Sequence, residues 1–420
     1  MNFQKILVLS IAFLIGGNSL AQSVRSPYSR NGLGDLLFQG LPNNFAMGEV
    51  GIGSPAAWHI NLQNPSFLVT NGFSSFQVGL SGDFRNYESN ADTGSENAAS
   101  LRFLAMSFPV VSKRWASSFA LLPLSTVGYS TFSQEDVGAT ATSITEFEGE
   151  GGISQLIWAN GFRIYKTLAL GVKASYVFGN ISRESRVQLA GEDFGSNYAI
   201  SYFQETAYSD VNLSLGVSYK FFMKENTRAI NIGGIYELSN ELEGVTDEFY
   251  QRLSLSGATI QGQSISEGEK STYGLPESFG FGLSYEVIGK VLVGVDYKTQ
   301  GWGNANRENA DLTLRNTTNI ALGASFTPDY RSVKNYLKRG TYRFGANYKQ
   351  LPYLVNNTEI NDFGINFGVS LPVNVYSSMD LAFKFGQRGT TNNNLIQEKY
   401  FQVLIGATIN DRWFIKRRYD

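Results

Sequence analysis

Hydrophobic and polar side chains alternate with a period of two over most of the C-terminal part of the chain. In the run 363–371, for example, Phe363, Ile365 and Phe367 alternate with glycine and asparagine. The same pattern occurs in 341–349, 379–386 and 401–409. Successive side chains of a β-strand point to opposite faces, and about ten residues of a tilted strand cross a bilayer. These runs therefore predict transmembrane β-strands.

Further strand-like runs follow one another from Phe73 onwards. They are Phe76–Phe84, Leu101–Val111, Trp115–Phe132, Leu156–Tyr165, Leu168–Phe178, Val211–Phe221 (with Ile200–Phe203 as its start), Ile230–Leu238, Phe279–Tyr285, Val291–Tyr297 and Ile320–Phe326. With the C-terminal runs this gives about 14 strands, an even number, as in bacterial single-chain barrels. The sequence predicts an all-β fold, an antiparallel transmembrane β-barrel.

The lengths of the connections between these runs orient the predicted barrel. Short links lie at 112–114, 166–167, 224–227, 289–290 and 373–377. Long polar links alternate with them at 86–99, 133–146, 180–198, 240–270, 303–311, 350–361 and 387–397. Short periplasmic turns and long external loops are typical of outer-membrane barrels, so we expect both termini on the periplasmic side. The exception is Thr327–Arg339, which is too long for a turn and is expected to hold a small helix.

Periodicity alone leaves open which face of the barrel is apolar, because a soluble barrel alternates in the same way with its apolar face inside. The face opposite the aromatic residues is rich in Gly, Ser and Asn, which suits a watery lumen. Aromatic residues also lie near the strand ends, at Tyr219, Phe221, Tyr285, Tyr297 and Tyr348, where an interfacial girdle is found. We therefore expect the apolar face to meet lipid.

The N-terminal part of the chain lacks this alternation and differs in composition. Residues 1–21 combine Lys5, the apolar run Ile6–Ile15 and a small residue on each side of Leu20, which predicts a cleaved signal peptide rather than a membrane anchor. Residues 22–72 are irregular and rich in Gly, Pro and Asn, and predict a plug, or hatch, in the barrel lumen. The predicted domains are completed by a barrel over 73–414 and a basic periplasmic tail over 415–420.

Composition narrows the possible partners. Charged residues make up 17% and aromatic residues 14% of the 420 residues, a balance that suits a membrane barrel better than an average soluble protein. The net charge of -2 gives no reason to expect nucleic acid as a partner. The chain has no cysteine, so disulfides, thiolate metal sites and a lipoprotein anchor are excluded.

Two N-terminal motifs, Ala46–Ile52 and Leu62–Phe67, resemble the FadL-type outer-membrane transporters of long-chain fatty acids and other hydrophobic compounds. The segment Leu275–Gly282 and the ending Trp413–Tyr419 are also similar to that family. The resemblance implies a barrel of 14 strands with an N-terminal hatch closed by an Asn-Pro-Ala motif, which Asn64, Pro65 and Ser66 match except for the last residue. The opening Ser26–Asp35 is not part of that pattern and indicates a divergent branch whose substrate is unassigned.

The resemblance further implies that a hydrophobic small molecule enters the lumen and leaves sideways through the wall at a kinked third strand. Pro123 lies within the predicted third strand, followed by Gly128. Proline lacks a backbone donor and, inside a sheet, marks an edge, bulge or kink. Pro123 and Gly128 are therefore the lateral-gate candidates, with a bulge of no functional consequence as the alternative.

A fatty-acid carboxylate would need a cation in the lumen. Alternation places Arg163, Lys173, Arg343 and Lys384 on the inward face, and a cation on the lipid face near the midplane would cost about 2–4 kcal/mol. These four residues are the candidate substrate-binding residues. The alternative is that they are solvated wall, because the inward face is otherwise mostly small and polar.

An enzyme is not expected. The chain has one histidine, His59, which predicts neither a barrel-borne catalytic base beside a serine nor a multi-histidine metal site. No nucleotide motif or metal-spaced carboxylate cluster is visible, so we expect no cofactor and no metal.

Two classes of function stay open for a protein expected in the cell outer membrane. The first is transport of a hydrophobic compound, with outer-membrane lipid and the barrel-assembly machinery as general partners. The second is a structural or interaction subunit of an outer-membrane protein-secretion or surface-assembly machine, in which long external loops contact other outer-membrane proteins. A passive pore is less favoured, because residues 22–72 are expected to fill the lumen.

Overall fold

The computed structural model describes residues 26–90, 92–137, 141–191, 198–224, 226–254, 256–305 and 314–412. The predicted signal peptide and the predicted basic tail lie outside these residues. The sixteen longer strands are β2 Ser74–Glu88, β3 Thr93–Val111, β4 Trp115–Val137, β5 Ala141–Arg163, β6 Leu168–Gly191, β7 Tyr198–Met223, β8 Arg228–Glu237, β9 Asn240–Ser254, β10 Thr259–Leu275, β11 Ser278–Val287, β12 Val291–Gln300, β13 Thr317–Phe326, β14 Thr341–Val355, β15 Thr358–Pro372, β16 Ser378–Arg388 and β17 Gln397–Asp411. The short elements are η1 Pro27–Arg30, β1 Asp35–Leu36, α2 Pro42–Phe45, η2 Pro65–Thr70, η3 Trp302–Asn304, η4 Tyr336–Arg339 and η5 Asn392–Asn394.

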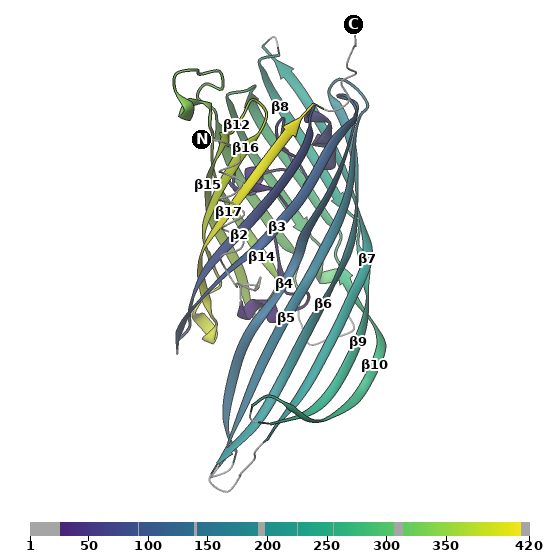
Figure 1. The fold of residues 1–420 in the computed structure, drawn as a ribbon, viewed down its shortest axis with the longest axis vertical. Coiled ribbons are helices and arrows are strands. Elements are labelled where there is room, and N and C mark those ends of the chain that lie inside the picture. The colour runs from purple at the N-terminus through teal and green to yellow at the C-terminus, as the bar shows by residue number, and fades with distance from the viewer. Residues whose placement is uncertain are drawn as a thin grey trace.

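The strands form a closed antiparallel barrel, because β17 pairs with β2 along its whole length (Figure 1). β8 and β9 both pair with β7, end to end, and so act as one strand with a break between them. β10 and β11 likewise pair with β9 and β8 and form one broken strand. Counted in this way the barrel has 14 strands. Every run predicted from the sequence lies on one of them and overhangs it by no more than two residues, but several strands, such as β5, extend far beyond the predicted run.

The two faces of the wall differ as the alternation predicted. Phe344 and Leu322 point outwards and keep 61% and 54% of their surface exposed, whereas Asn366 and Ser284, on the inward face, are buried. A sheet can span lipid when it closes into a barrel, because the backbone groups of its strands are then paired with neighbouring strands. The apolar face is therefore the outer face of a transmembrane barrel. Among the described residues, no helix is long and apolar enough to cross a membrane.

The long polar links predicted at 86–99, 133–146, 180–198, 240–270 and 350–361 are mostly wrong, because strands occupy most of these residues. β4 and β5 remain paired as far as Val137 and Ala141, and 240–270 forms most of the β9–β10 hairpin. Residues 121–137 of β4, 141–156 of β5, 176–191 of β6 and 198–211 of β7 pair side by side. Together with β9 and β10 they form a curved sheet that projects beyond the rest of the barrel (Figure 1). We call it the extension sheet. These residues pair as strands without the strict alternation of the wall, because neither face of the projecting sheet lies in a uniform apolar layer.

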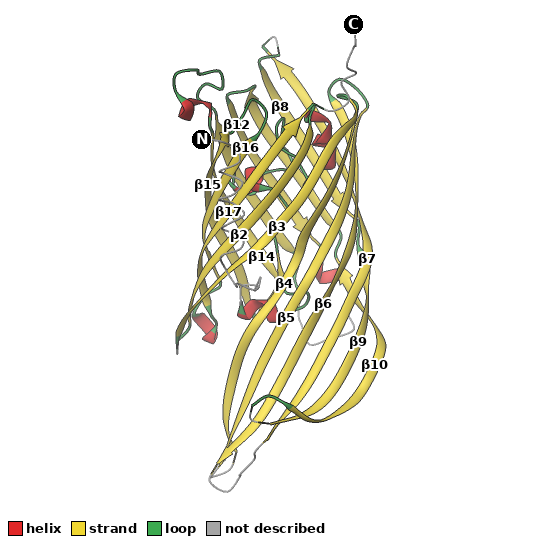
Figure 2. Cartoon of the chain, viewed as in Figure 1, coloured by secondary structure: helices red, strands yellow, loops and turns green. Residues whose placement is uncertain are grey.

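The short links are confirmed, and they share one end of the barrel with the start of β2 and the end of β17. We call this end the short-turn rim. The exceptional link, Thr327–Arg339, holds the 3₁₀ turn η4, in agreement with the small helix expected there. Figure 2 shows this turn in red at the upper left, beside the ring of strands.

Candidate lumenal site and wall opening

Residues 26–72, which we call the N-terminal segment, lie inside the barrel. η2 contacts β4–β7, whereas α2 contacts β15, β16 and β17. The inward glycines of the wall allow this close approach. A Cβ added at Gly171 would collide with the backbone of Ser66, and one added at Gly233 would collide with the carbonyl of Ile52. The small inward face noted in the sequence therefore fits a filled lumen.

The predicted hatch motif joins the N-terminal segment to the wall. The Asn64 side chain caps η2, because its Oδ1 accepts hydrogen bonds from the Ser66 backbone N–H at 3.1 Å and from the Ser66 hydroxyl at 2.7 Å. Its Nδ2 donates to the carbonyls of Ile52, at 2.9 Å, and Val217, at 3.1 Å. Val217 belongs to β7, so the asparagine holds two parts of the segment against the wall. The proline that follows it starts η2, where no donor is needed. Movement of this motif as a hatch stays a prediction.

A carboxylate of the wall holds a second part of the segment. Asp296, on β12, accepts hydrogen bonds from the backbone N–H groups of Gly51 and Ile52, each at 2.6 Å, and of Gly53 at 3.1 Å. Three donors converge on one buried anion, which is the arrangement of a backbone anion nest. Glycine at positions 51 and 53 lets the backbone approach the wall, since an added Cβ at Gly53 would collide with Gly282.

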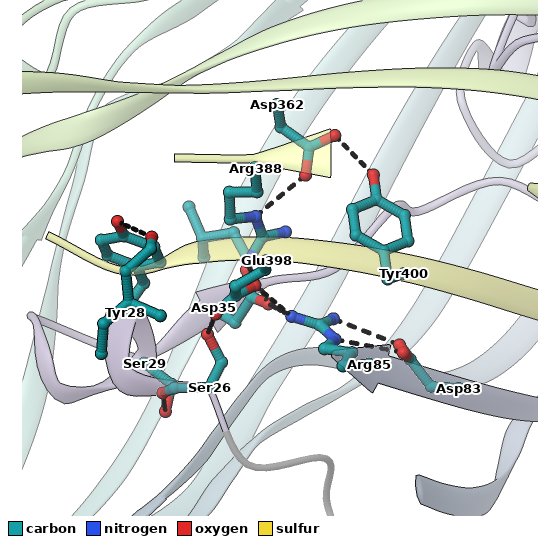
Figure 3. Close-up of polar contacts among 12 residues, drawn as sticks. Ser26, Tyr28, Ser29, Asp35, Asp83, Arg85, Asp362, Arg388, Glu398 and Tyr400 are labelled. Atoms are coloured by element: carbon teal, nitrogen blue, oxygen red, sulfur yellow. Dashed lines mark hydrogen bonds and ion pairs between the residues drawn. The ribbon is translucent and has the colours of Figure 1, made fainter. Parts of the chain in front are cut away.

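An ion-pair network, shown in Figure 3, attaches the start of the segment to β2, β15, β16 and β17. Asp35 lies 2.7 Å from the Arg388 guanidinium, which also contacts Asp362 at 2.9 Å. Arg85 contacts Glu398 at 3.0 Å. Burial acts to raise the pKa of Asp35, but the guanidinium groups of Arg388 and Arg85 outweigh it, so the pKa lies below its usual value and the carboxyl is ionised. We call Asp35, Arg85, Asp362, Arg388 and Glu398 the lumenal ion network.

Sequence reasoning missed this network, although part of the signal was present. The even-numbered positions of β16 face inward, and they include Lys384 and, four residues later, Arg388. Continuing the alternation past the predicted runs also places Arg85, Asp362 and Glu398 on the inward face. Asp35 carries no such signal, because it lies in an irregular stretch.

The four predicted cations all have partners within the chain. The Lys384 ammonium lies 2.8 Å from Glu49 of the N-terminal segment, and Lys173 lies 3.7 Å from Glu237. Arg163 donates to the Val69 carbonyl at 3.3 Å, and Arg343 donates to the Ser370 hydroxyl at 2.5 Å. Lys173 and Lys384 line one cavity, which Arg163 and Arg343 do not reach. The structure therefore does not gather the four into one anion site, and substrate binding by them stays a prediction.

That cavity has a volume of about 840 Å³ and lies between the N-terminal segment and the wall. Part of its lining is apolar, with Phe38, Phe103 and Leu122 close to β3 and β4. The remainder is charged and includes Lys298, Glu237 and members of the lumenal ion network. The apolar side chains gather beside β3 and β4, where Arg102 also lines the cavity, and charged side chains predominate across the lumen.

The wall is split between β3 and β4 beside the apolar part of this cavity. The described β3–β4 ladder ends at Leu104 and Leu121, although β3 stays paired with β2 to its tip and β4 stays paired with β5. Pro123 lies two residues past the last pair, at a bulge in the β4–β5 ladder. A residue without a backbone donor thus stands where the strand loses its neighbour.

The N-terminal segment occupies this split. β1 pairs with the free edge of β4, with Asp35 opposite Thr126 and Leu36 opposite Ser125. Gly128, the second gate candidate, accepts a hydrogen bond from the Ser26 N–H at 2.6 Å. On the other side of the split, Arg102 of β3 donates to the Phe38 carbonyl at 2.6 Å. Residues 26–38 therefore bridge the two strands that have parted.

Comparison with known proteins agrees with this architecture. The toluene transporter TbuX of Ralstonia pickettii superposes with a TM-score of 0.58 at 13% identity, covering 89% of this chain and 99% of that chain. The toluene transporter TodX of Pseudomonas putida gives 0.57 at 15% identity, covering 91% and 100%. A FadL homologue of Pseudomonas aeruginosa gives 0.56 at 12% identity, covering 90% and 99%. At these identities the likeness shows the fold, and it confirms the FadL-type barrel predicted from the sequence.

No curated protein matches the chain. Closed, lipid-facing barrels with an even number of antiparallel strands are proteins of the bacterial outer membrane, which confirms the expected location. A family model does match, over residues 3–420, and its description is BamG. Because the match covers almost the whole sequence, the chain belongs to the BamG family.

Proposed function

We propose that this outer-membrane barrel is an interaction subunit of a barrel-assembly complex, and that the extension sheet is its contact surface for other outer-membrane proteins. The observation that carries the proposal is the surface of this sheet. Large apolar side chains stay exposed on it well beyond the apolar wall, including Phe132 at 77%, Ile260 at 57% and Tyr250 at 53%. Exposed apolar patches outside a lipid belt are typical of protein-protein contact sites.

The filled lumen supports the same reading. The N-terminal segment is bonded to the wall by the Asn64 contacts, the Asp296 nest and the lumenal ion network. All four predicted cations have partners within the chain, and two of them, Lys173 and Lys384, are already paired with the carboxylates of Glu237 and Glu49. Membership of the BamG family is consistent with a role in assembly.

A photo-crosslinking amino acid placed at Phe132 or Tyr250 in the full-length protein tests this proposal. We expect an adduct with another subunit of the barrel-assembly machinery, identified by mass spectrometry of native outer membranes. The same crosslinker at Phe344, on the lipid-facing wall, is the control. We also expect depletion of the protein to lower the amounts of other outer-membrane barrels. Absence of a subunit adduct from the extension sheet, together with unchanged barrel levels, would rule the proposal out.

Lateral passage of a hydrophobic compound is the second candidate function. The split between β3 and β4 and the apolar part of the cavity beside it favour this candidate, with Pro123 and Gly128 at the opening. Pro123→Val restores a backbone donor at the bulge. If the barrel passes apolar substrates, this variant should take up a labelled aromatic hydrocarbon or fatty acid more slowly while staying folded. Equal uptake by cells with and without the protein would remove this candidate.

A further inference from the structure

The loop between β13 and β14, residues 327–340, combines exposed apolar side chains with a high positive charge. Val333 is 96% exposed and Leu337 is 60% exposed, and Tyr330 and Tyr336 are exposed at 55% and 44%. The loop also carries Arg331, Lys334, Lys338 and Arg339, against one acidic residue, Asp329. Exposed apolar side chains gathered on one short loop are typical of a surface that contacts a membrane or another molecule.

The loop is held in a defined position at the edge of the wall. The Tyr336 hydroxyl donates to the Pro372 carbonyl at the end of β15, at 2.9 Å. The Tyr342 hydroxyl donates to the Leu337 carbonyl at 3.0 Å. The Asp329 backbone N–H donates a hydrogen bond to the Lys338 carbonyl at 2.8 Å, which closes the base of the loop. η4 is thereby fixed across the ends of β14 and β15, beside the ring of strands (Figure 2).

This position makes the apolar surface of the loop continuous with the lipid-facing wall. Tyr342, which holds η4, is itself an outward side chain of β14 and is followed on the same face by Phe344. The cations lie against the rim aromatics, with the Arg331 guanidinium 5.1 Å from the Tyr330 ring and the Arg339 guanidinium 4.9 Å from the Tyr336 ring. Aromatic rings with basic side chains beside an apolar surface are typical of the membrane interface, where long cations reach for lipid phosphates.

The loop belongs to a rim that is basic as a whole. Other exposed cations on the short turns are Lys113, Arg114, Lys166, Lys224 and Lys290. The loop differs from these turns because it places four cations and four exposed apolar side chains on one short segment. Charge attracts the segment to an anionic surface, and the apolar groups bind it there, which is the combination of an interfacial membrane element.

We propose that residues 327–340 form a binding site for anionic phospholipid headgroups in the leaflet beside the short-turn rim. In this arrangement Tyr330, Val333, Tyr336 and Leu337 enter the headgroup and acyl boundary. Arg331, Lys334, Lys338 and Arg339 contact phosphate oxygens. The site is independent of the lumen and of the extension sheet, so it holds whichever function the barrel performs.

The absence of cysteine from the chain makes a direct test possible. Val333→Cys is labelled with a polarity-sensitive fluorophore, and the full-length protein is placed in nanodiscs of phosphatidylcholine with increasing phosphatidylglycerol. We expect the emission to shift to the blue as phosphatidylglycerol is added. The same label at Ser133→Cys, exposed on the extension sheet, should not respond. Glycerol phosphate added to pure phosphatidylcholine discs should not reproduce the shift, which separates a lipid headgroup from free phosphate.

Charge variants complete the test. In the labelled protein, Arg331→Gln with Lys334→Gln, Lys338→Gln and Arg339→Gln should raise the phosphatidylglycerol fraction needed for half of the shift at least tenfold, since each cation near an anionic surface contributes to binding. The matched control removes the same charge elsewhere on the rim, with Arg114→Gln, Lys166→Gln, Lys224→Gln and Lys290→Gln, and should change that fraction less than twofold. The proposal is overturned if the probe stays in a polar environment, if both lipids act alike, or if the two charge variants behave alike. It is also overturned if only an acidic periplasmic protein shifts the probe.

Discussion

The carboxylate of Asp35 lies 2.7 Å from the guanidinium of Arg388, although the two residues are 353 positions apart in the sequence. This contact joins the beginning of the N-terminal segment to a strand near the end of the barrel. Both side chains are buried, so their charges are poorly screened by water and each depends on its partner. The contact makes the position of the segment sensitive to single substitutions.

Asp35→Asn should loosen the start of the N-terminal segment without opening the barrel. Removing one partner of a buried pair usually costs about 3–5 kcal/mol. Arg388 keeps Asp362 at 2.9 Å, so we expect a smaller loss, about 1–3 kcal/mol. Urea unfolding in lipid vesicles measures it, and limited proteolysis should cut residues 26–38 faster. Lys399→Gln breaks the exposed Lys399–Glu88 pair, whose side chains are more than half exposed, and should leave both readouts unchanged.

Asp296→Asn should free the glycine-containing loop that contacts β12. The amide side chain keeps an acceptor oxygen but loses the charge that three backbone N–H groups share. Hydrogen bonds to a charged group contribute about 1.5–3 kcal/mol. Hydrogen exchange of residues 51–53 should therefore become at least tenfold faster, while exchange in β12 stays slow. Unchanged exchange at residues 51–53 would show that the nest does not hold the loop.

Asn64→Ala should destabilise η2 and separate it from β7. The substitution removes the cap on Ser66 and the two contacts to the carbonyls of Ile52 and Val217. Loss of a cap costs about 1–2 kcal/mol, and the freed carbonyls add to it. Proteolysis and exchange of residues 61–70 report the change. Asn392→Ala, at an exposed turn on the other end of the barrel, is the control and should behave like the unaltered protein.

A disulfide between the N-terminal segment and the wall separates the two candidate functions. Leu36 and Ser125 are directly opposed in the β1–β4 pair, and opposed residues of antiparallel strands lie within the range that a disulfide spans. Leu36→Cys with Ser125→Cys should form the bond on oxidation, because the chain has no other cysteine. If hydrophobic compounds leave through the split, oxidation should stop uptake and a reductant should restore it. If the protein acts as an interaction subunit alone, the crosslinked form should support normal amounts of other outer-membrane barrels.

The wall of the barrel could be predicted from the sequence because one physical rule governs it. Each residue such as Phe367 meets lipid and each neighbour such as Asn366 meets the lumen, so the pattern has period two throughout. The extension sheet escaped the same rule. From Arg183 to Val187 the side chains of both faces are partly exposed, so pairing with β5 and β7 determines the strand and hydrophobicity does not.

Only the part of the candidate site that the wall supplies could be predicted from the sequence. Alternation placed Lys173 and Lys384 on the inward face correctly, because a cation facing lipid is excluded energetically. It could not reveal that Glu49 lies beside Lys384, since the position of an irregular segment inside the lumen depends on contacts with many strands at once. Pro123 stood out as a break in a strand, but the replacement of the missing neighbour by Asp35 and Leu36 carried no local signal.

The location of residues 26–72 inside a ring closed by β2 and β17 restricts the order of biogenesis. These residues are synthesised before any strand of the wall, whereas β17 is synthesised last. The first part of the polypeptide contacts β4–β7 and β15–β17, and further contacts join it to β2, β3 and β12. Later threading through a finished cylinder would require each of those bonds to form in a confined space. The N-terminal segment need not be inserted into a finished barrel if the hairpins assemble around it in order. In that case the pairing of β17 with β2 is the last step.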